Sequence, residues 1–176
     1  MKPVVLAALA AALASPAPGL AAGQATTLAA TIAAMPKGIE RGRGPSLDSS
    51  IAAARAAVAA CAAGGHRVCA LVVDAQGQTV VLLSGDGAGY RSQLIARTKA
   101  NTVVKYRQAS MAVAVRAEKD AVLKAEIAAD PDIGMARGGG VPIMVDGVFL
   151  GAFAVSGAFG PDEECVDAAM ARVDFR

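Results

Sequence analysis

Two pairs of closely spaced β-branched runs constrain the fold of this chain more than any other feature of its sequence. The first pair covers residues 67–74 and 79–84, and the second covers residues 141–145 and 148–156. The second pair is separated only by Asp146-Gly147, the strongest short signal for a hairpin. Hairpins pair their strands antiparallel, whereas a doubly wound parallel sheet needs repeated βαβ crossovers. The sequence therefore predicts a small antiparallel sheet.

Helical segments flank and separate these two hairpins. The first begins at residues 46–48, where Ser46 or Asp48 can cap it, and ends at Gly64-Gly65. Its apolar positions recur at helical spacing at Leu47, Ile51, Ala54, Val58 and Cys61. Further helices are predicted at about residues 91–106, 110–129 and 161–173. Because the runs of the first hairpin are apolar on both faces, we expect helices to cover both sides of the sheet, which gives an α+β fold.

The N-terminal segment predicts export. Lys2 precedes an apolar run over residues 4–14, helix breakers follow at residues 15–19, and small residues lie at 21–23. This is the order of a secretory signal peptide, and the run is shorter than the roughly 20 residues of a membrane-spanning helix. The alternative is an alanine-rich helix that stays attached. We predict a signal peptide over residues 1–22, a flexible leader over 23–46, a domain over 47–176, and a periplasmic or secreted protein that is not embedded in a membrane.

Charge and cysteine content narrow the classes of partner. The formal net charge is +2, and no run of Lys and Arg forms the basic stripe typical of nucleic-acid binding. Cys61, Cys69 and Cys165 contain no C-x-x-C pair, which disfavours a zinc or thioredoxin-like site. In an oxidising compartment two of the three can pair; alternatively, each is a small buried apolar residue.

Familiar catalytic centres find little support in the sequence. The chain has one histidine, His66, and no G-x-S-x-G motif, so serine hydrolysis and a histidine-based zinc site are set aside. Asp86 and Gly87 lie in a glycine-rich turn that lacks the Lys-Ser/Thr of a phosphate loop. The sequence favours binding of a small ligand over hydrolytic or metal chemistry.

Lys99 is the most informative polar residue. At about 100° per residue, it falls near the middle of the face of the 91–106 helix that should be packed. A buried ammonium is unfavourable unless it is paired or meets an anion. We therefore expect Lys99 to point into a pocket and meet a carboxylate; the alternative is a lysine that snorkels past apolar neighbours to water.

A second cationic segment lies just before the third β run. Arg137 precedes Gly138, Gly139 and Gly140, whose backbone amides can hold an anion. The alternative is a loop that needs unusual dihedral angles. The acidic run Asp162-Glu163-Glu164 is explained by its place in the first turn of a helix, where the helix dipole favours negative charge.

A series of short motifs follows in order along the chain: Val72-Val73-Asp74 with Gly77, Asp86-Gly87-Ala88, Ser92, Lys99-Ala100, Thr102, Gly139-Gly140-Val141-Pro142-Ile143, Asp146-Gly147, Gly151-Ala152, Val155-Ser156-Gly157-Ala158 and Asp162-Glu163. In this order and spacing, over about residues 47–172, they resemble the HbpS/GlcG-like haem-binding family. The resemblance implies a profilin-like α/β sandwich, with a single antiparallel sheet of about five strands flanked by helices, and assembly into homo-oligomers. It also implies haem as a cofactor, since some members bind haem and some degrade it.

The chain departs from the family's pattern at two places. Ser84-Gly85 stand where the family often has an Arg before Asp-Gly-Ala, and Gly138 stands where it often has a Pro. A haem-contacting arginine at the first place is therefore missing, and no axial ligand is carried over, although His66 is a candidate for contact with the haem iron.

The leading hypothesis is an exported haem-binding or haem-responsive accessory protein. Its predicted ligand-binding residues are Lys99, Arg137, Gly138, Gly139, Gly140, Asp86 and Gly87. The alternatives are a binding or sensor protein for a small organic acid, and an oligomeric structural module that supports a partner protein. Haem degradation is the one enzymatic activity that stays open.

Overall fold

The computed structural model describes residues 28–34 and 42–175. The chain divides into two compact units, residues 1–39 and 40–176. The described part of the first unit is helix α1 (Leu28–Ala34), which lies within the predicted leader. The predicted signal peptide lies outside the described residues. No helix among the described residues is long and apolar enough to cross a membrane.

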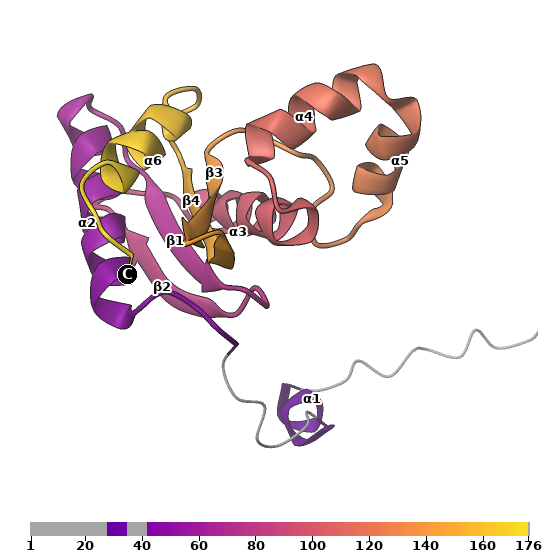
Figure 1. Ribbon diagram of the computed structural model, residues 1–176, viewed down its shortest axis with the longest axis horizontal. Helices are drawn as coiled ribbons and strands as arrows, with labels where there is room; N and C mark the ends of the chain where they lie inside the picture. The colour runs from indigo at the N-terminus through magenta and orange to yellow at the C-terminus, as the bar shows by residue number, and fades with distance from the viewer. Residues whose placement is uncertain (1–27, 35–41, 176) are drawn as a thin grey trace, which may run out of the picture. The chain divides into compact units, whose positions relative to one another are not determined.

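The second unit alternates helices and hairpins in the predicted order. Its elements are α2 (Leu47–Ala63), β1 (Cys69–Asp74), β2 (Thr79–Ser84), α3 (Tyr90–Tyr106), α4 (Ser110–Lys119), α5 (Ala121–Ala129), β3 (Gly140–Val145), β4 (Val148–Ser156) and α6 (Asp162–Met170). The strands form one antiparallel sheet in the order β2-β1-β4-β3. Helices α2 and α6 lie together on one face, and α3 lies on the other (Figure 1). The predicted fold class is confirmed.

Alternation along the central strands divides the core into two layers. In β1, Ala70 and Val72 pack into the cluster that contains α2 and α6, whereas Leu71 and Val73 pack against α3. Because successive side chains of a strand point to opposite faces, a strand that is apolar at every position must be covered on both sides. That expectation holds for β1 but only partly for the edge strand β2, where Leu82 is 45% exposed.

Helix α2 is capped as predicted, and most of its predicted apolar stripe packs on the core: Ala54 and Cys61 are buried, and Val58 packs against them. The Ser46 hydroxyl accepts a hydrogen bond from the Ser49 amide at 3.1 Å, which satisfies one of the free N–H groups at the helix start. Leu47 was expected in the apolar stripe but is 54% exposed. Ala53 and Ala57, next to the predicted stripe, are also buried, and such small residues let the helix backbone approach the sheet closely.

The single helix predicted over residues 110–129 is wrong. Asp120 interrupts it with an extended backbone, and its carboxylate accepts hydrogen bonds from the amides of Val122 and Leu123, each at 3.0 Å. This cap favours a new start at that point, so α4 and α5 fold back on each other around a small apolar cluster.

The second unit also has one strand fewer than the resemblance implied. The described residues form a four-stranded sheet. The segment before α2 makes a backbone contact with the β1–β2 turn, from the Ala75 amide to the Arg43 carbonyl at 3.0 Å. A single such bond does not make a ladder, because a paired strand exchanges bonds along its length.

A disulfide joins the two helices on one face of the sheet. Cys61 of α2 and Cys165 of α6 are bonded, with their Cα atoms 5.5 Å apart and 104 residues between them in the chain. Cys69, in the buried strand β1, is a free cysteine. Burial raises the pKa of the Cys69 thiol, which keeps it protonated and unreactive near neutral pH.

Removing this bridge should destabilise the protein strongly. Closing a loop of about 100 residues restricts the unfolded chain by roughly 4–5 kcal/mol in the chain-entropy model, so Cys61→Ser/Cys165→Ser should lose up to about that free energy of unfolding. Urea unfolding measures the loss. Refolding the wild type under reducing conditions should lower its free energy of unfolding by a similar amount. The same treatment should not change the free energy of unfolding of the double variant. Equal urea midpoints for the reduced and oxidised wild type would contradict the assignment.

An exposed ion-pair cluster ties α5 to the end of α3. The Lys105 ammonium lies 2.9 Å from Glu126 Oε1 and 2.8 Å from Asp130 Oδ2. These hydrogen bonds lower the pKa of both carboxyls and raise the pKa of Lys105. The cluster therefore stabilises the folded state above the ordinary carboxyl pKa values of 3.8 and 4.5.

Stability supplied by this cluster should disappear in acid. Because the folded carboxyl pKa values are lowered, the contribution is lost as the pH falls through them. Lys105→Met should lower the melting temperature slightly at about pH 6, and this difference should shrink toward zero as the pH falls and the two carboxyls become protonated. Thermal melts of the two proteins across this range test the prediction, and a difference that persists at the acid end would refute it.

Candidate functional site

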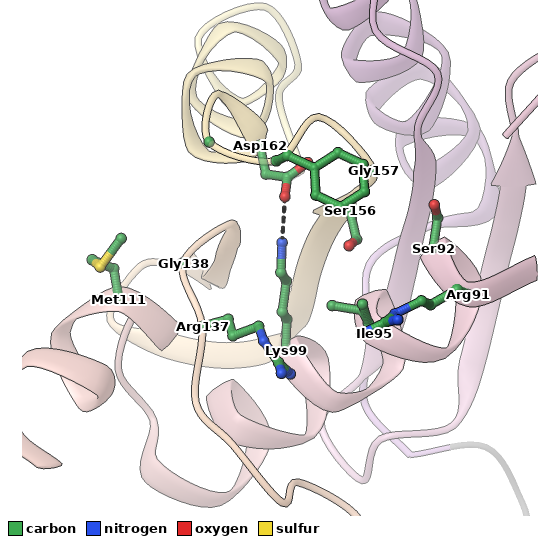
Figure 2. A pocket seen from close by; sticks show the side chains of 12 residues that line it. Arg91, Ser92, Ile95, Lys99, Met111, Arg137, Gly138, Ser156, Gly157 and Asp162 are labelled. Carbon is green, nitrogen blue, oxygen red and sulfur yellow. Dashed lines mark hydrogen bonds and ion pairs between the residues drawn. The ribbon is translucent and has the colours of Figure 1, made fainter. Parts of the chain in front are cut away.

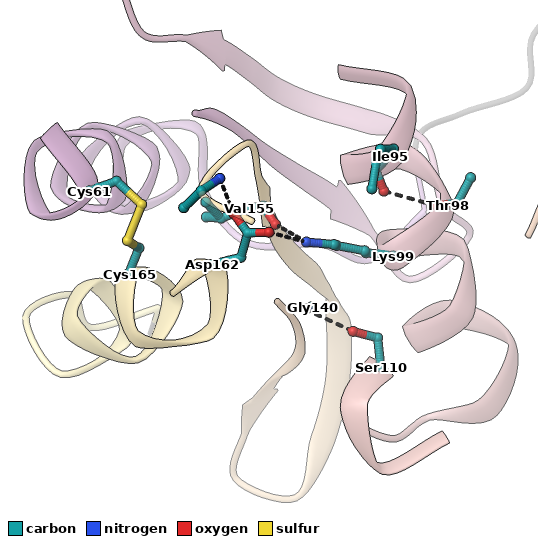
Figure 3. A network of polar contacts seen from close by, with 10 residues as sticks. Cys61, Ile95, Thr98, Lys99, Ser110, Gly140, Val155, Asp162 and Cys165 are labelled. Atoms are coloured by element: carbon teal, nitrogen blue, oxygen red, sulfur yellow. Dashed lines mark hydrogen bonds and ion pairs between the residues drawn. A yellow bond between two sulfur atoms is a disulfide. The ribbon is translucent and has the colours of Figure 1, made fainter. Parts of the chain in front are cut away.

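A buried ion pair connects the two faces of the sheet. Lys99 lies in the middle of α3 and is 2% exposed. Its ammonium donates hydrogen bonds to Asp162 Oδ2 at 2.7 Å and to the Val155 carbonyl at 2.8 Å (Figure 3). The other oxygen of Asp162 accepts a hydrogen bond from the Ala158 amide at 2.9 Å. Helix α3, strand β4 and the start of α6 are therefore fixed to one another by two side chains.

The charge on Lys99 is balanced inside the protein. Burial lowers the pKa of Lys99, the contact with Asp162 opposes this change, and the nearby Arg137 guanidinium lowers the pKa further. Lys99 was predicted to meet a carboxylate, with a ligand as the source. The carboxylate that the buried ammonium contacts is Asp162 of the chain itself, 63 residues away.

Two of the three consecutive glycines make room for this pair. A β-carbon on Gly139, at φ +98°, would lie 2.8 Å from Lys99 Nζ and equally close to the Val155 carbonyl. The Gly140 amide donates to the Ser110 hydroxyl at 2.9 Å, and a β-carbon there would crowd Lys99. The close approach of backbone to an ion pair thus accounts for Gly139 and Gly140 without a ligand.

An open cleft of about 380 Å³ lies beside the ion pair (Figure 2). Its walls come from the first half of α3, the start of α4, the loop at residues 137–138 and the loop between β4 and α6. Ile95, Met111 and Phe159 give it an apolar lining, and Arg91 and Arg137 bring positive charge. Lys99 and Asp162 form part of the same lining.

The structure brings together some of the predicted ligand-binding residues and separates others. Lys99, Arg137 and Gly138 line this cleft. Asp86 lines a different hollow of about 300 Å³, together with His66. Gly87 packs close to the Arg67 side chain, since a β-carbon on Gly87 would lie 2.9 Å from Arg67 Cδ. A small ligand in the cleft would therefore contact Lys99, Arg137 and Gly138, but not Asp86 or Gly87.

Sequence reasoning missed several residues of the cleft. Arg91, Ile95 and Lys99 are spaced four apart on α3, so all three lie on one side of the helix, and this spacing could have identified the first two. Met111 and Phe159 carry no comparable signal, because α4 and the β4–α6 loop meet α3 only in the folded chain.

The two arginines of the cleft have no partner in the part of the chain that the structure describes. Neither Arg91 nor Arg137 makes a side-chain hydrogen bond or ion pair with a described residue. A guanidinium offers five donors in a planar fork that fits a carboxylate, so each is available to an anion in the cleft. By contrast, no group of three or more His, Cys, Asp or Glu that could hold a metal ion occurs among the described residues.

Comparison with known proteins agrees with this architecture. Residues 46–171 match the family described as "Haem degrading protein HbpS-like". The chain belongs to this HbpS-like family. The resemblance inferred from the sequence motifs is thereby confirmed. No curated protein matches the chain.

Solved structures similar to this HbpS-like chain include two crystal structures of HbpS. One is a double mutant of Streptomyces reticuli HbpS, 32% identical, which covers 78% of this chain and 92% of that one with a TM-score of 0.65. The PduOC:haem complex shares the fold at 24% identity, covering 76% of this chain and 99% of that one with a TM-score of 0.67. A Klebsiella pneumoniae protein, ORFY, shares it at 22% identity, with coverage of 78% and 94% and a TM-score of 0.67.

Breaking the buried pair should be more harmful than removing it. Lys99→Met leaves the largely buried Asp162 carboxylate without its cation, which should lower the free energy of unfolding by about 3–5 kcal/mol. Adding Asp162→Asn removes the unpaired charge and keeps an oxygen that can accept from the Ala158 amide, so much of the loss should be recovered. Urea unfolding of the wild type, both single variants and the double variant gives the coupling energy. Additive losses would show that the pair is not a unit.

Proposed function

We propose that this chain is an exported haem-binding protein and that the cleft beside α3 receives the haem. One observation carries the proposal: two guanidiniums without a described partner, Arg91 and Arg137, lie on a largely apolar cleft in a chain of the HbpS-like family. Haem is a flat, mostly apolar macrocycle with two carboxylates. Its propionates match the arginines, and its ring matches Ile95 and Met111 in chemical character. At about 380 Å³ the cleft is within the usual size range of ligand pockets.

Each cleft residue has a distinct part in holding the group. Arg91 and Arg137 would each take a propionate through charge-assisted hydrogen bonds, which guanidiniums can make in pairs. Ile95 and Met111 would pack against the ring, and the Met111 thioether is a type of donor that haem iron accepts. The Lys99–Asp162 pair would keep the adjoining wall rigid, with its charge already balanced. When bound, the haem itself would supply redox or oxygen chemistry.

The alternatives would leave part of the cleft without a purpose. A small organic acid would use the two guanidiniums but not the apolar lining. A purely structural module would need neither the two guanidiniums nor the apolar lining. We assign no catalytic residue, so the proposal concerns binding; the haem degradation named in the family's description remains the activity to test.

Two features support export. The N-terminal segment has the order of a signal peptide, and the Cys61–Cys165 disulfide belongs to an oxidising compartment such as the periplasm or the exterior. Homo-oligomerisation is also part of the proposal. Apolar side chains at Leu82 of β2 and Leu94 of α3 are exposed, and β2 is an edge strand whose outer side has no partner among the described residues.

Haem titration of the purified mature protein tests the proposed function. The wild type should give a saturable change in the Soret band. Arg91→Gln/Arg137→Gln should weaken binding at least about tenfold, because a hydrogen bond to a charged group contributes roughly 1.5–3 kcal/mol. Arg55→Gln/Arg172→Gln is the matched control: it also removes two positive charges, but from exposed positions outside the cleft lining.

A wild type without a saturable Soret change would remove the proposal. Thermal stabilisation by a small carboxylic acid, in the absence of any haem response, would instead select the organic-acid alternative. Equal weakening by Arg55→Gln/Arg172→Gln and by Arg91→Gln/Arg137→Gln would show that overall charge, and not the cleft, attracts the ligand.

A further inference from the structure

Phe159, in the loop between β4 and α6, is placed in a way that its own chain does not explain. It lines the cleft, yet the residue is 97% exposed. Its backbone has φ +56°, in the left-handed region that a β-carbon disfavours and that bulky residues rarely occupy. Phenylalanine is ordinarily buried. Here the chain holds an aromatic ring in an unfavourable backbone conformation and gains no burial from it.

The backbone on both sides of Phe159 is firmly held. A β-carbon on Gly157 would lie 2.4 Å from the Arg67 carbonyl, so that residue packs directly against neighbouring backbone. The Ala158 amide donates to Asp162 Oδ1 at 2.9 Å. Asp162 in turn is bound by the buried ammonium of Lys99 at 2.7 Å. The ion pair therefore fixes the loop, and the loop presents the ring at the cleft.

We propose that Phe159 stacks on the flat face of the ligand and gives the cleft its preference for a planar aromatic macrocycle over a small non-planar acid. This inference rests on the proposed haem function and adds a division of roles to it. Arg91 and Arg137 recognise carboxylates, which many ligands carry, whereas Phe159 recognises a planar aromatic surface. Because the backbone of the loop is already fixed, little backbone freedom is lost when the ligand arrives, and only the side chain has to become ordered.

The test separates the role of Phe159 in binding from any role in stability. Phe159→Gly removes the ring and suits the left-handed backbone, so it should leave the melting temperature unchanged or raise it. The same variant should weaken binding of haemin by roughly tenfold or more, which is the range of a lost stacking contact. Metal-free protoporphyrin IX should show the same loss, because stacking does not require iron. Phe159→Trp should bind both probes about as well as the wild type.

Tyr90→Ala provides the matched control. Tyr90 is also an exposed aromatic residue, 72% accessible at the first position of α3, but it is not part of the cleft lining. It should bind both probes as the wild type does. Wild-type affinity of Phe159→Gly for both probes would overturn this inference and leave the haem proposal standing. A wild type that binds neither probe would remove the haem proposal, and this inference with it.

Discussion

The contact between Lys99 and Asp162 organises the part of the domain on which the proposed function depends. It joins helix α3, on one face of the sheet, to the first residue of α6, on the other, and the Val155 carbonyl completes it. A buried ammonium is tolerated only with such partners, so the pair also dictates its surroundings. Gly139 must lack a side chain because a β-carbon would collide with the pair.

The pair also explains how the cleft divides its charges. Lys99 contributes to the wall but is satisfied internally, so the cations left for a ligand are Arg91 and Arg137. The second oxygen of Asp162 holds the loop that carries Phe159. A single internal interaction thus supports an apolar, cationic cleft and positions an exposed aromatic ring at its edge, without being a ligand contact of its own.

Helical spacing predicted that Lys99 would be buried, because the position of a residue around a helix is a local property. The sequence could not identify the partner of Lys99, because Asp162 lies 63 residues further along the chain. In addition, the helix dipole already explained an acidic residue at that place in a first helical turn. The same limit applies to Asp120, whose capping role was hidden within a continuous helical pattern. Asp86 and Gly87 were grouped with the cleft by sequence motif, but the fold places Asp86 in another hollow.

The sequence by itself determined the two hairpins, the antiparallel pairing within each and the helices between them, because each depends on residues that are neighbours in the chain. It also determined the family, through the order of short motifs over about residues 47–172. The tertiary structure decided which charges neutralise one another and which stay available. That outcome depends on distances between segments far apart in the sequence: Lys99 meets Asp162, whereas Arg91 and Arg137 meet no described partner. Electrostatic pairing falls off with distance in space, and spacing along the chain does not specify that distance.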